Sequence, residues 1–239
     1  MKKKILVVVG TRPNFIKVTR FKEVAHSYTD IEIKIVHTGQ HFDEKMANVF
    51  FEQFKLTPDF FLNINPVSAN MQMAETMIGL EKIISEYKPV LLVVVGDVNS
   101  TLAASITANK INIQLAHVES GLRSFDKTMP EENNRIMTDE IADLFFVTEQ
   151  SGTDNLIKEN KPKDKIYFVG NTMIDTMVKF SADVEKSDIL QKYSLSEKKF
   201  VLMTMHRPAT VDTADGLLKL NDLLQEVGRK YKILFPVHP

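Results

Sequence analysis

Short apolar runs rich in β-branched residues recur along the chain, and a glycine or a polar residue closes each of them. Runs of about four to eight such residues are typical of strands that are buried on both faces of a parallel sheet. The pattern predicts strands over Ile5–Val9, Ile31–Val36, Val90–Val95, Ile111–Ala116, Leu144–Val147, Ile166–Val169, Phe200–Met203 and Ile233–Val237.

Longer stretches whose apolar residues have helical spacing separate most of these runs. Apolar residues recur three and four positions apart in two clear examples, which are Phe15, Val18, Phe21, Val24 and Ala25, and Met73, Met77, Leu80, Ile83 and Ile84. Such spacing places apolar side chains on one face of a helix. Strands that alternate with helices indicate right-handed βαβ units and a doubly wound α/β fold.

The stretch from Ser181 to Lys199 is mostly polar and carries no strong strand signal. It predicts a Rossmann-like domain over residues 1–180, a linker over 181–199 and the start of a second Rossmann-like domain over 200–239. The second domain would hold two strands and one helix at about Asp215–Tyr231, which are too few to bury a core of their own. We therefore expect the second domain to be incomplete in this chain.

Composition and charge limit the partners that the chain can bind. The 239 residues are 44% apolar, and 30 basic residues against 31 acidic ones give a formal net charge of −1. So small a charge offers no global field for nucleic acid or an anionic membrane. No apolar run approaches the ~20 residues that span a bilayer. The lack of cysteine excludes disulfides and thiolate chemistry, and it fits a reducing, cytoplasmic compartment.

Polar or titratable residues follow five of the predicted strands. In open α/β sheets, ligands bind beyond the carboxyl ends of the strands, so these residues predict a site at one edge of the sheet. The five segments are Gly10-Thr11-Arg12-Pro13, His37-Thr38-Gly39-Gln40-His41, Gly96-Asp97, His117-Val118-Glu119 and Met205-His206-Arg207.

The first of these segments is suited to holding an anion. Gly10 permits a tight turn, Thr11 can cap a helix, and Arg12 and Lys17 add positive charge near the amides of the helix start. A capped helix with two solvated cations is the alternative. The spacing G-x-G-x-x-G is absent, which disfavours a dinucleotide-dependent enzyme.

Carboxylates supply the candidate acid–base groups. Asp97 and Glu119 each follow an apolar run directly, where catalytic carboxylates tend to lie in such sheets. Glu131 and Glu132 begin a predicted helix, where they could act in catalysis or simply offset the helix dipole by ~0.3–1 kcal/mol. His206 follows a strand and could act as a catalyst or as a loop hydrogen-bonding residue. No ligand cluster has metal spacing, so we expect neither a metal nor another cofactor.

Together these segments resemble the non-hydrolysing UDP-N-acetylglucosamine 2-epimerases. The ordered set is highly specific, although each motif alone is weak. The matching pieces are Gly10-Thr-Arg-Pro with Lys17, His37-Thr-Gly-Gln-His41, Gly96-Asp97, His117-Val-Glu119-Ser-Gly-Leu-Arg123, Pro130-Glu-Glu-Asn-Asn-Arg135, Gly170-Asn-Thr and His206-Arg207.

The resemblance implies two Rossmann-like domains of the GT-B type, the second incomplete here. It implies an isomerase that interconverts UDP-N-acetylglucosamine and UDP-N-acetylmannosamine by eliminating and re-adding UDP through 2-acetamidoglucal, for surface polysaccharide synthesis. It also implies a homodimer in the full-length form. The implied catalytic residues are Asp97, Glu119, Glu131 and His206, the implied nucleotide- or substrate-binding residues are Arg12, Lys17, Arg123, Arg135 and Arg207, and the implied allosteric residues are Gln40, His41 and His238.

The chain departs from the family pattern in two places. Pro208-Ala209-Thr210 follows Arg207 where many members have an acid and an asparagine, and an arginine expected near Asn70-Met71-Gln72 is absent. The missing part of the second domain supplies much of the nucleotide pocket in the family, so we expect this 239-residue form to be poorly active. The alternatives are a UDP-2,3-diacetamido-sugar 2-epimerase, a hydrolysing epimerase, a UDP-sugar glycosyltransferase and a non-catalytic UDP-sugar binding module.

Overall fold

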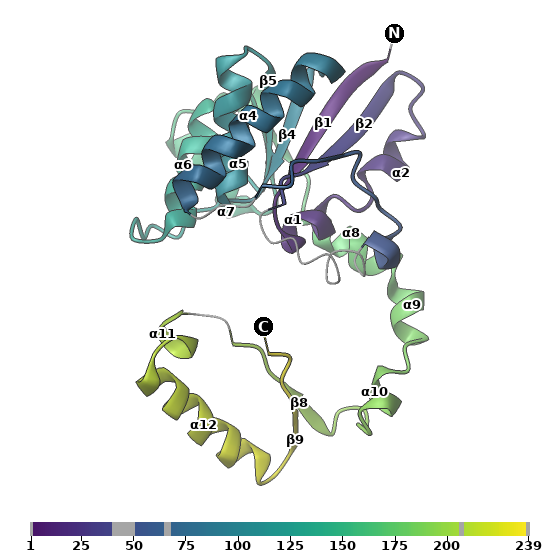
Figure 1. The fold of residues 1–239 in the computed structure, drawn as a ribbon, viewed down its shortest axis with the longest axis vertical. Coiled ribbons are helices and arrows are strands. Elements are labelled where there is room, and N and C mark those ends of the chain that lie inside the picture. The colour runs from purple at the N-terminus through teal and green to yellow at the C-terminus, as the bar shows by residue number, and fades with distance from the viewer. Residues whose placement is uncertain (1, 40–50, 65–67, 206–207, 238–239) are drawn as a thin grey trace. The chain divides into compact units, whose positions relative to one another are not determined.

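The computed structural model describes residues 2–39, 51–64, 68–205 and 208–237. The chain forms two compact units, Met1–Lys179 and Phe180–Pro239, which we call unit 1 and unit 2. Figure 1 labels most of the elements of both. The predicted division into a domain, a linker over 181–199 and a second domain stays a prediction. In the described part of the chain, no helix has both the length and the apolar character that crossing a membrane requires.

Unit 1 is built on a sheet of seven parallel strands. The strand order is β3-β2-β1-β4-β5-β6-β7, in which the chain first moves outward on one side of β1 and then on the other. This is the doubly wound arrangement that the sequence predicts. The strands are β1 (Lys3–Val9), β2 (Ile31–His37), β3 (Phe60–Phe61), β4 (Leu91–Val95), β5 (Gln114–Val118), β6 (Leu144–Val147) and β7 (Ile166–Phe168).

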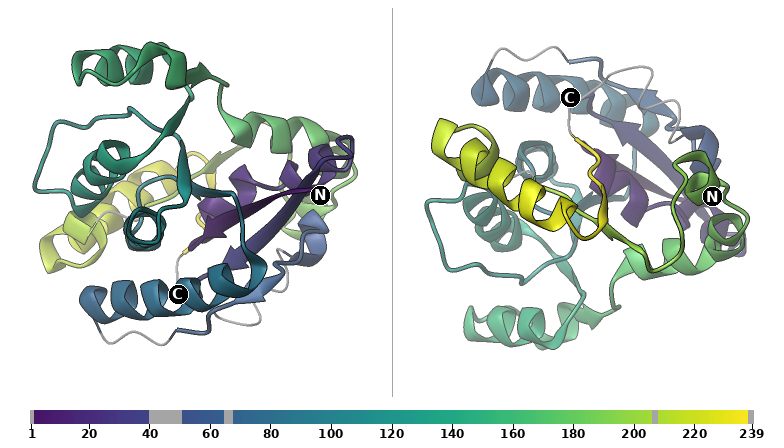
Figure 2. Two further views of the ribbon diagram at one scale, coloured as in Figure 1. Left: turned by 90° about the horizontal axis from the view of Figure 1, so that it is seen from above. Right: turned by 90° about the horizontal axis from the view of Figure 1, so that it is seen from below.

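Helices lie on both sides of this sheet (Figures 1 and 2). The longest, α4, begins at Ala69 because the Ser68 hydroxyl accepts a hydrogen bond from the Met71 amide at 3.2 Å. The helices of unit 1 whose two ends lie within the described residues are α1 (Arg12–Lys17), α2 (Phe21–Ala25), α4 (Ala69–Tyr87), α5 (Asn99–Lys110), α6 (Pro130–Ile141), α7 (Gln150–Lys158), the 3₁₀ turn η1 (Lys163–Lys165) and α8 (Thr172–Lys179).

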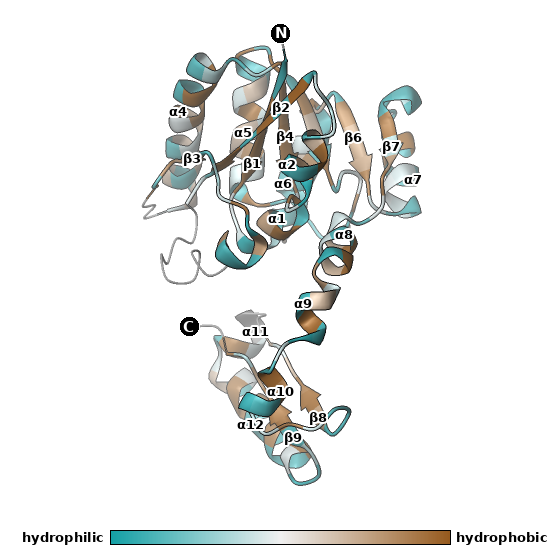
Figure 3. Ribbon diagram, turned by 90° about the vertical axis from the view of Figure 1, so that its right-hand side faces the viewer, coloured by the Kyte–Doolittle hydropathy of each residue, from teal (hydrophilic) through white to brown (hydrophobic). Residues whose placement is uncertain are grey.

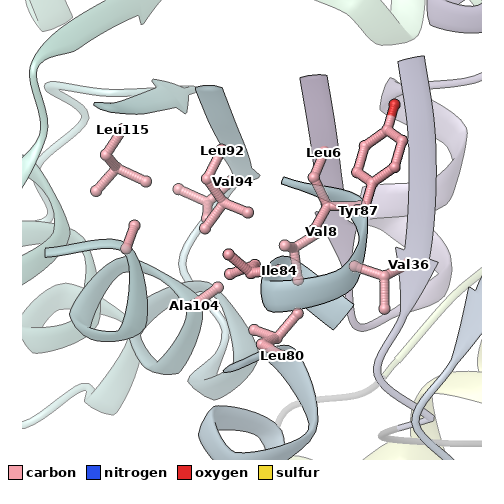
Figure 4. Packing of buried hydrophobic residues seen from close by; sticks show 11 residues of the cluster. Leu6, Val8, Val36, Leu80, Ile84, Tyr87, Leu92, Val94, Ala104 and Leu115 are labelled. Atoms are coloured by element: carbon pink, nitrogen blue, oxygen red, sulfur yellow. The ribbon is translucent and has the colours of Figure 1, made fainter. Parts of the chain in front are cut away.

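Alternate residues of the strands build two core clusters, one on each face of the sheet. Leu6 and Val8 of β1 point toward α4 and α5, where Leu80 and Ile84 of α4 meet them (Figure 4). Val7 of β1 points the other way and belongs to the cluster that contains Phe15 of α1. Because the strands are buried on both faces, their sequences are continuous apolar runs. In Figure 3 the central strands are therefore brown, the colour of hydrophobic residues.

The strand predicted over Ile111–Ala116 begins later than expected, at Gln114. Asn112 has a φ of 59°, in the left-handed region that asparagine tolerates, and the Ile113 amide donates to the carbonyl of Ala108 at 2.9 Å. Ile111 and Ile113 therefore close helix α5 and pack against the core without joining the sheet. The prediction was wrong for these residues because an apolar helix end has the same composition as a strand.

Unit 2 contains two parallel strands, β8 (Phe200–Leu202) and β9 (Lys232–Leu234), which pair in register from Phe200 with Lys232. Its helices are α9 (Ser181–Glu185), α10 (Ile189–Lys192), α11 (Pro208–Val211) and α12 (Ala214–Gly228). The Thr213 hydroxyl caps α12 by accepting from the Gly216 amide at 3.0 Å. Leu220 is buried, whereas the side chains of Leu202, Leu217 and Leu218 are exposed.

Candidate functional site

The carboxyl ends of β4 and β5 carry two of the predicted catalytic acids. These strands are neighbours in the sheet, so Asp97 after β4 and Glu119 after β5 lie at the same edge. Gly96 joins the two strand ends, because its amide donates to the carbonyl of Val118 at 3.0 Å. Its φ of 70° turns the chain sharply out of the sheet at this point.

Glu119 forms an ion pair with Lys17, which ends helix α1. The Nζ–Oε2 distance is 2.5 Å, and the two side chains are only 11% and 16% exposed. A Cβ atom placed on Gly96 would lie 3.4 Å from the same Oε2 and 3.6 Å from Nζ, so the pair packs directly beside Gly96. Glu119 has a φ of 72°, a conformation that is strained for a residue with a side chain. Backbone strain at a candidate catalytic residue is a common feature of active sites.

Asp97 forms a second ion pair, with Arg135 of helix α6. The guanidinium of Arg135 also contacts Glu132, at 2.8 Å between Nη1 and Oε2. Asn134, from the same helix, donates to the backbone carbonyl of Asp97 at 2.9 Å. The first turns of α6 are therefore fixed against the loop that follows β4. Arg135 lies beside Asp97 and pairs with two carboxylates of the protein, and its role in binding the substrate stays a prediction.

Glu131 and Glu132 differ sharply in environment although they are adjacent. Glu132 is 1% exposed, and its carboxylate accepts the amides of Ser124 and Phe125 at 2.9 and 3.0 Å. Burial alone would raise the pKa of Glu132, but these hydrogen bonds and the charge of Arg135 outweigh burial and lower it. Glu131 is exposed, and within the described ranges no hydrogen bond or ion pair joins it to Asp97 or Glu119. Its catalytic role stays a prediction.

A buried network lies next to the two acids. His117, the fourth residue of β5, contacts Asp139 of α6, and Asp139 in turn pairs with Arg123 at 2.7 Å. Arg123 completes the network with two bonds to Glu159, of 2.8 and 2.6 Å. Since these acids occupy its guanidinium, the geometry favours a structural role for Arg123, and the substrate contact implied by the resemblance stays a prediction.

The turn after β1 is closed by Asn14. Its Oδ1 accepts from the Thr11 hydroxyl at 2.9 Å, and its Nδ2 donates to the carbonyl of Val95 at 3.0 Å, so α1 is tied to β4. Arg12 is the first residue of α1 and is exposed at this edge of the sheet. The structure thus brings Arg12 and Lys17 to the strand ends that the sequence predicted.

Five predicted site residues lie outside the described residues, so the structure gives no test of them. They are Gln40, His41, His206, Arg207 and His238. His37, which precedes the first two, is 6% exposed at the end of β2, and its Nδ1 accepts from the Gly39 amide at 3.0 Å. Burial lowers the pKa of His37 to about 4.

The sequence analysis missed Asp139 and Glu159, and it gave no role to Asn134, which lies in the matching segment from Pro130 to Arg135. The sequence did carry a signal for Asp139. Glu132, Arg135 and Asp139 are three and four residues apart, so they share one face of α6. A charged stripe of this kind usually faces solvent, whereas here it faces the protein and pairs with residues of other elements.

Comparison with known proteins shows which family the chain is similar to. The family model described as UDP-N-acetylglucosamine 2-epimerase matches residues 23–239. The UDP-N-acetylglucosamine 2-epimerase of Methanococcus maripaludis is 36% identical over 99% of this chain and 65% of its own length. The UDP-2,3-diacetamido-2,3-dideoxy-D-glucuronate 2-epimerase of Pseudomonas aeruginosa is 35% identical over 99% of this chain and 67% of its own length.

A solved structure shows the same likeness in three dimensions. It is the Methanocaldococcus jannaschii UDP-GlcNAc 2-epimerase in complex with UDP-GlcNAc and UDP, with a TM-score of 0.89 and 35% identity over 99% of this chain and 66% of that one. The likeness confirms the α/β fold class of the GT-B type that the sequence predicts. The chain spans about two thirds of the length of these relatives. On the family match and these similarities, the chain belongs to the UDP-N-acetylglucosamine 2-epimerase family.

Proposed function

We propose that the protein carrying this sequence epimerises C2 of a UDP-N-acetylhexosamine, interconverting UDP-N-acetylglucosamine and UDP-N-acetylmannosamine. One observation carries the proposal beyond family membership. Two carboxylates, Asp97 and Glu119, stand at neighbouring strand ends, and each is held by a cation, Arg135 or Lys17. The site therefore combines the acids that move a proton with cations at the same edge of the sheet, of which Arg12 and Lys17 can face an anionic leaving group.

The chemistry proceeds by elimination and re-addition. A carboxylate removes the proton at C2, the electron pair of that C–H bond forms the C1–C2 double bond of 2-acetamidoglucal, and the C1–O bond breaks with UDP as the leaving group. UDP then attacks C1 again while an acid protonates C2 from the opposite face. The C2 proton is not acidic in the ground state, so the base acts while the diphosphate leaves.

We assign the proton transfers to Asp97, Glu119 and Glu131. Charge that resembles an oxocarbenium ion builds at C1 as the bond to UDP breaks, and neighbouring carboxylates stabilise it. Arg12 and Lys17, which α1 places at the edge of the sheet, would face the diphosphate. The ion pair between Lys17 and Glu119 supports this assignment. When the diphosphate of the substrate attracts Lys17, the Glu119 carboxylate loses its partner and is free to accept a proton.

UDP-2,3-diacetamido-2,3-dideoxy-D-glucuronate is a second candidate substrate and should be assayed as well. The relative named for UDP-2,3-diacetamido-2,3-dideoxy-D-glucuronate is 35% identical to this chain, and the M. jannaschii UDP-GlcNAc 2-epimerase is also 35% identical. Both substrates are UDP sugars with an acetamido group at C2, so the same acids could serve either. We propose the N-acetylglucosamine form first, a role in surface polysaccharide synthesis, and a homodimer for the complete protein.

Product analysis tests the proposal. The complete protein that carries this sequence is incubated with each UDP sugar, and the products are separated and identified. Formation of the C2 epimer still linked to UDP supports it. Free N-acetylmannosamine with UDP would mean a hydrolysing epimerase, transfer of the sugar to an acceptor would mean a glycosyltransferase, and tight binding without turnover would mean a binding module.

Variants test the assignment of the acids. Asp97→Asn, Glu119→Gln and Glu131→Gln should each lower kcat by ~10²-fold or more, the scale of lost acid–base catalysis. Glu140→Gln is the matched control, because Glu140 lies near the other end of α6 and its side chain is 74% exposed. A variant with a rate within about twofold of the wild type would remove that residue from the proton-transfer group.

A further inference from the structure

His117 is fully buried, and both of its ring nitrogens face hydrogen-bond acceptors. Nδ1 lies 2.6 Å from Oδ1 of Asp139, and Nε2 lies 2.8 Å from the backbone carbonyl oxygen of Gly96. A carbonyl oxygen can only accept, and a carboxylate that is also paired with Arg123 accepts as well. Both nitrogens therefore donate. An imidazole whose two protons are committed in this way cannot exchange a proton with a substrate.

The bond from Nε2 fixes the backbone at the point where the first candidate acid begins. The peptide group is planar, so holding the carbonyl of Gly96 also holds the plane that contains the amide of Asp97. The same glycine packs beside Glu119 and Lys17, and its amide is bound to the carbonyl of Val118. A tilt of this peptide would move Asp97 relative to Glu119.

Asp139 is held on the side away from His117. Its Oδ2 accepts from the amide of Gly121 at 2.9 Å and from Arg123 at 2.7 Å. Burial alone would raise the pKa of Asp139, but the charges of His117 and Arg123 outweigh it and lower it. One carboxylate thus connects, directly or through His117, the loop after β4 that carries Asp97 and the loop after β5 that follows Glu119.

We propose that His117 and Asp139 form a buried positioning pair for the epimerisation. The pair sets the orientation of the Gly96–Asp97 peptide, and through it the separation of the Asp97 and Glu119 carboxylates across the substrate. The pair acts through other residues and makes no contact with the reacting atoms. This inference rests on the proposed function, and it adds to that function residues that hold the acids in place.

Two matched substitutions separate positioning from simple core packing. In His117→Gln the side-chain amide can reach the place of Nε2 and still donate to Gly96, whereas in His117→Asn it reaches only the place of Nδ1 and the bond to Gly96 is lost. Both variants lose the imidazole, so both should melt at a lower temperature. A displacement of reacting groups by about 1 Å can cost ~10²-fold, so kcat should fall by about 10- to 100-fold for Asn and by less than about fivefold for Gln. KM should change by less than about threefold in both.

A second measurement detects the hydrogen bonds of His117 directly and does not depend on turnover. In the 239-residue chain with ¹⁵N-labelled histidine, NMR should show protons on both ring nitrogens of His117, exchanging slowly with solvent. Asp139→Asn should remove this signature. An unprotonated ring nitrogen in the wild type, or equal losses of kcat in the Gln and Asn variants, would overturn the inference. A wild-type protein that epimerises no UDP sugar would instead overturn the proposed function.

Discussion

Acid should destabilise unit 1 through His37 before it reaches the paired carboxylates. An unfolded histidine has a pKa near 6.5, and burial lowers the pKa of His37 to about 4 in the folded chain. Between these values the unfolded state binds a proton that the folded state does not. Stability therefore rises with pH through this window, is complete above pH 6.5, and is lost as the pH falls toward 4.

The expected loss is large enough to measure. One pKa unit corresponds to about 1.36 kcal/mol, so the full window from 6.5 to about 4 represents about 3 kcal/mol. The carboxylates whose pKa is lowered, such as Glu132, contribute stability that is lost only as the pH falls below the ordinary range of a glutamate. From pH 7 to pH 5 the contribution of His37 to the free energy of unfolding should fall by about 2 kcal/mol, and the difference between the wild type and a variant without His37 isolates this contribution from that of the other histidines.

Urea unfolding, followed by NMR signals of β1 and β2, measures this loss at several pH values. His37→Asn should flatten the profile between pH 7 and pH 5, because asparagine does not titrate and its oxygen can still accept from the Gly39 amide. His26→Asn, which removes an exposed histidine at the end of α2, is the control with which the slope of His37→Asn is compared. An equal slope in the wild type and in His37→Asn would refute the reasoning.

Two further predictions concern stability. Gly121→Ala should lower the free energy of unfolding of unit 1 by about 3–5 kcal/mol, since the new Cβ would lie 2.2 Å from the carbonyl oxygen of Gly152 at a φ of 78°, so that overpacking adds to the backbone strain. Gly170→Ala has a similar φ but open space, so it should cost only about 1–2 kcal/mol, and equal losses would argue against the clash. Arg123→Lys should lower the melting temperature and leave KM for the UDP sugar unchanged, because lysine cannot keep both bonds to Glu159. A raised KM with normal melting would place Arg123 on the substrate.

The strands could be predicted where an apolar run is both buried and closed by polar residues. Leu144–Val147 is a strand with the predicted bounds, for this reason. Phe60–Phe61 was not predicted, because two residues that pair only with Val36 and His37 leave no periodic signal. The helix predicted through Phe15–Ala25 is divided into α1 and α2, since helical spacing of apolar residues continues across the turn between them.

The edge of the sheet that carries the site could be predicted from the sequence, but the pairing within it could not. Asp97 and Glu119 follow strands, and the topology of an open sheet brings such positions together. The partner of Glu119 is 102 residues away in the sequence, so no local spacing identifies Lys17. Glu131 and Glu132 differ only by the rotation of α6 about its axis, which tertiary packing decides.

The most direct test of the proposed reaction is solvent exchange at C2. The complete protein is incubated with UDP-N-acetylglucosamine in deuterated water, and NMR follows the C2 proton signal of the nucleotide sugars. Removal of that proton by Asp97, Glu119 or Glu131 predicts one deuterium at C2 of the epimer, and loss of exchange in the three substituted variants. Epimer formed with its C2 proton retained, or turnover of the sugar with no deuterium at C2, would contradict the mechanism.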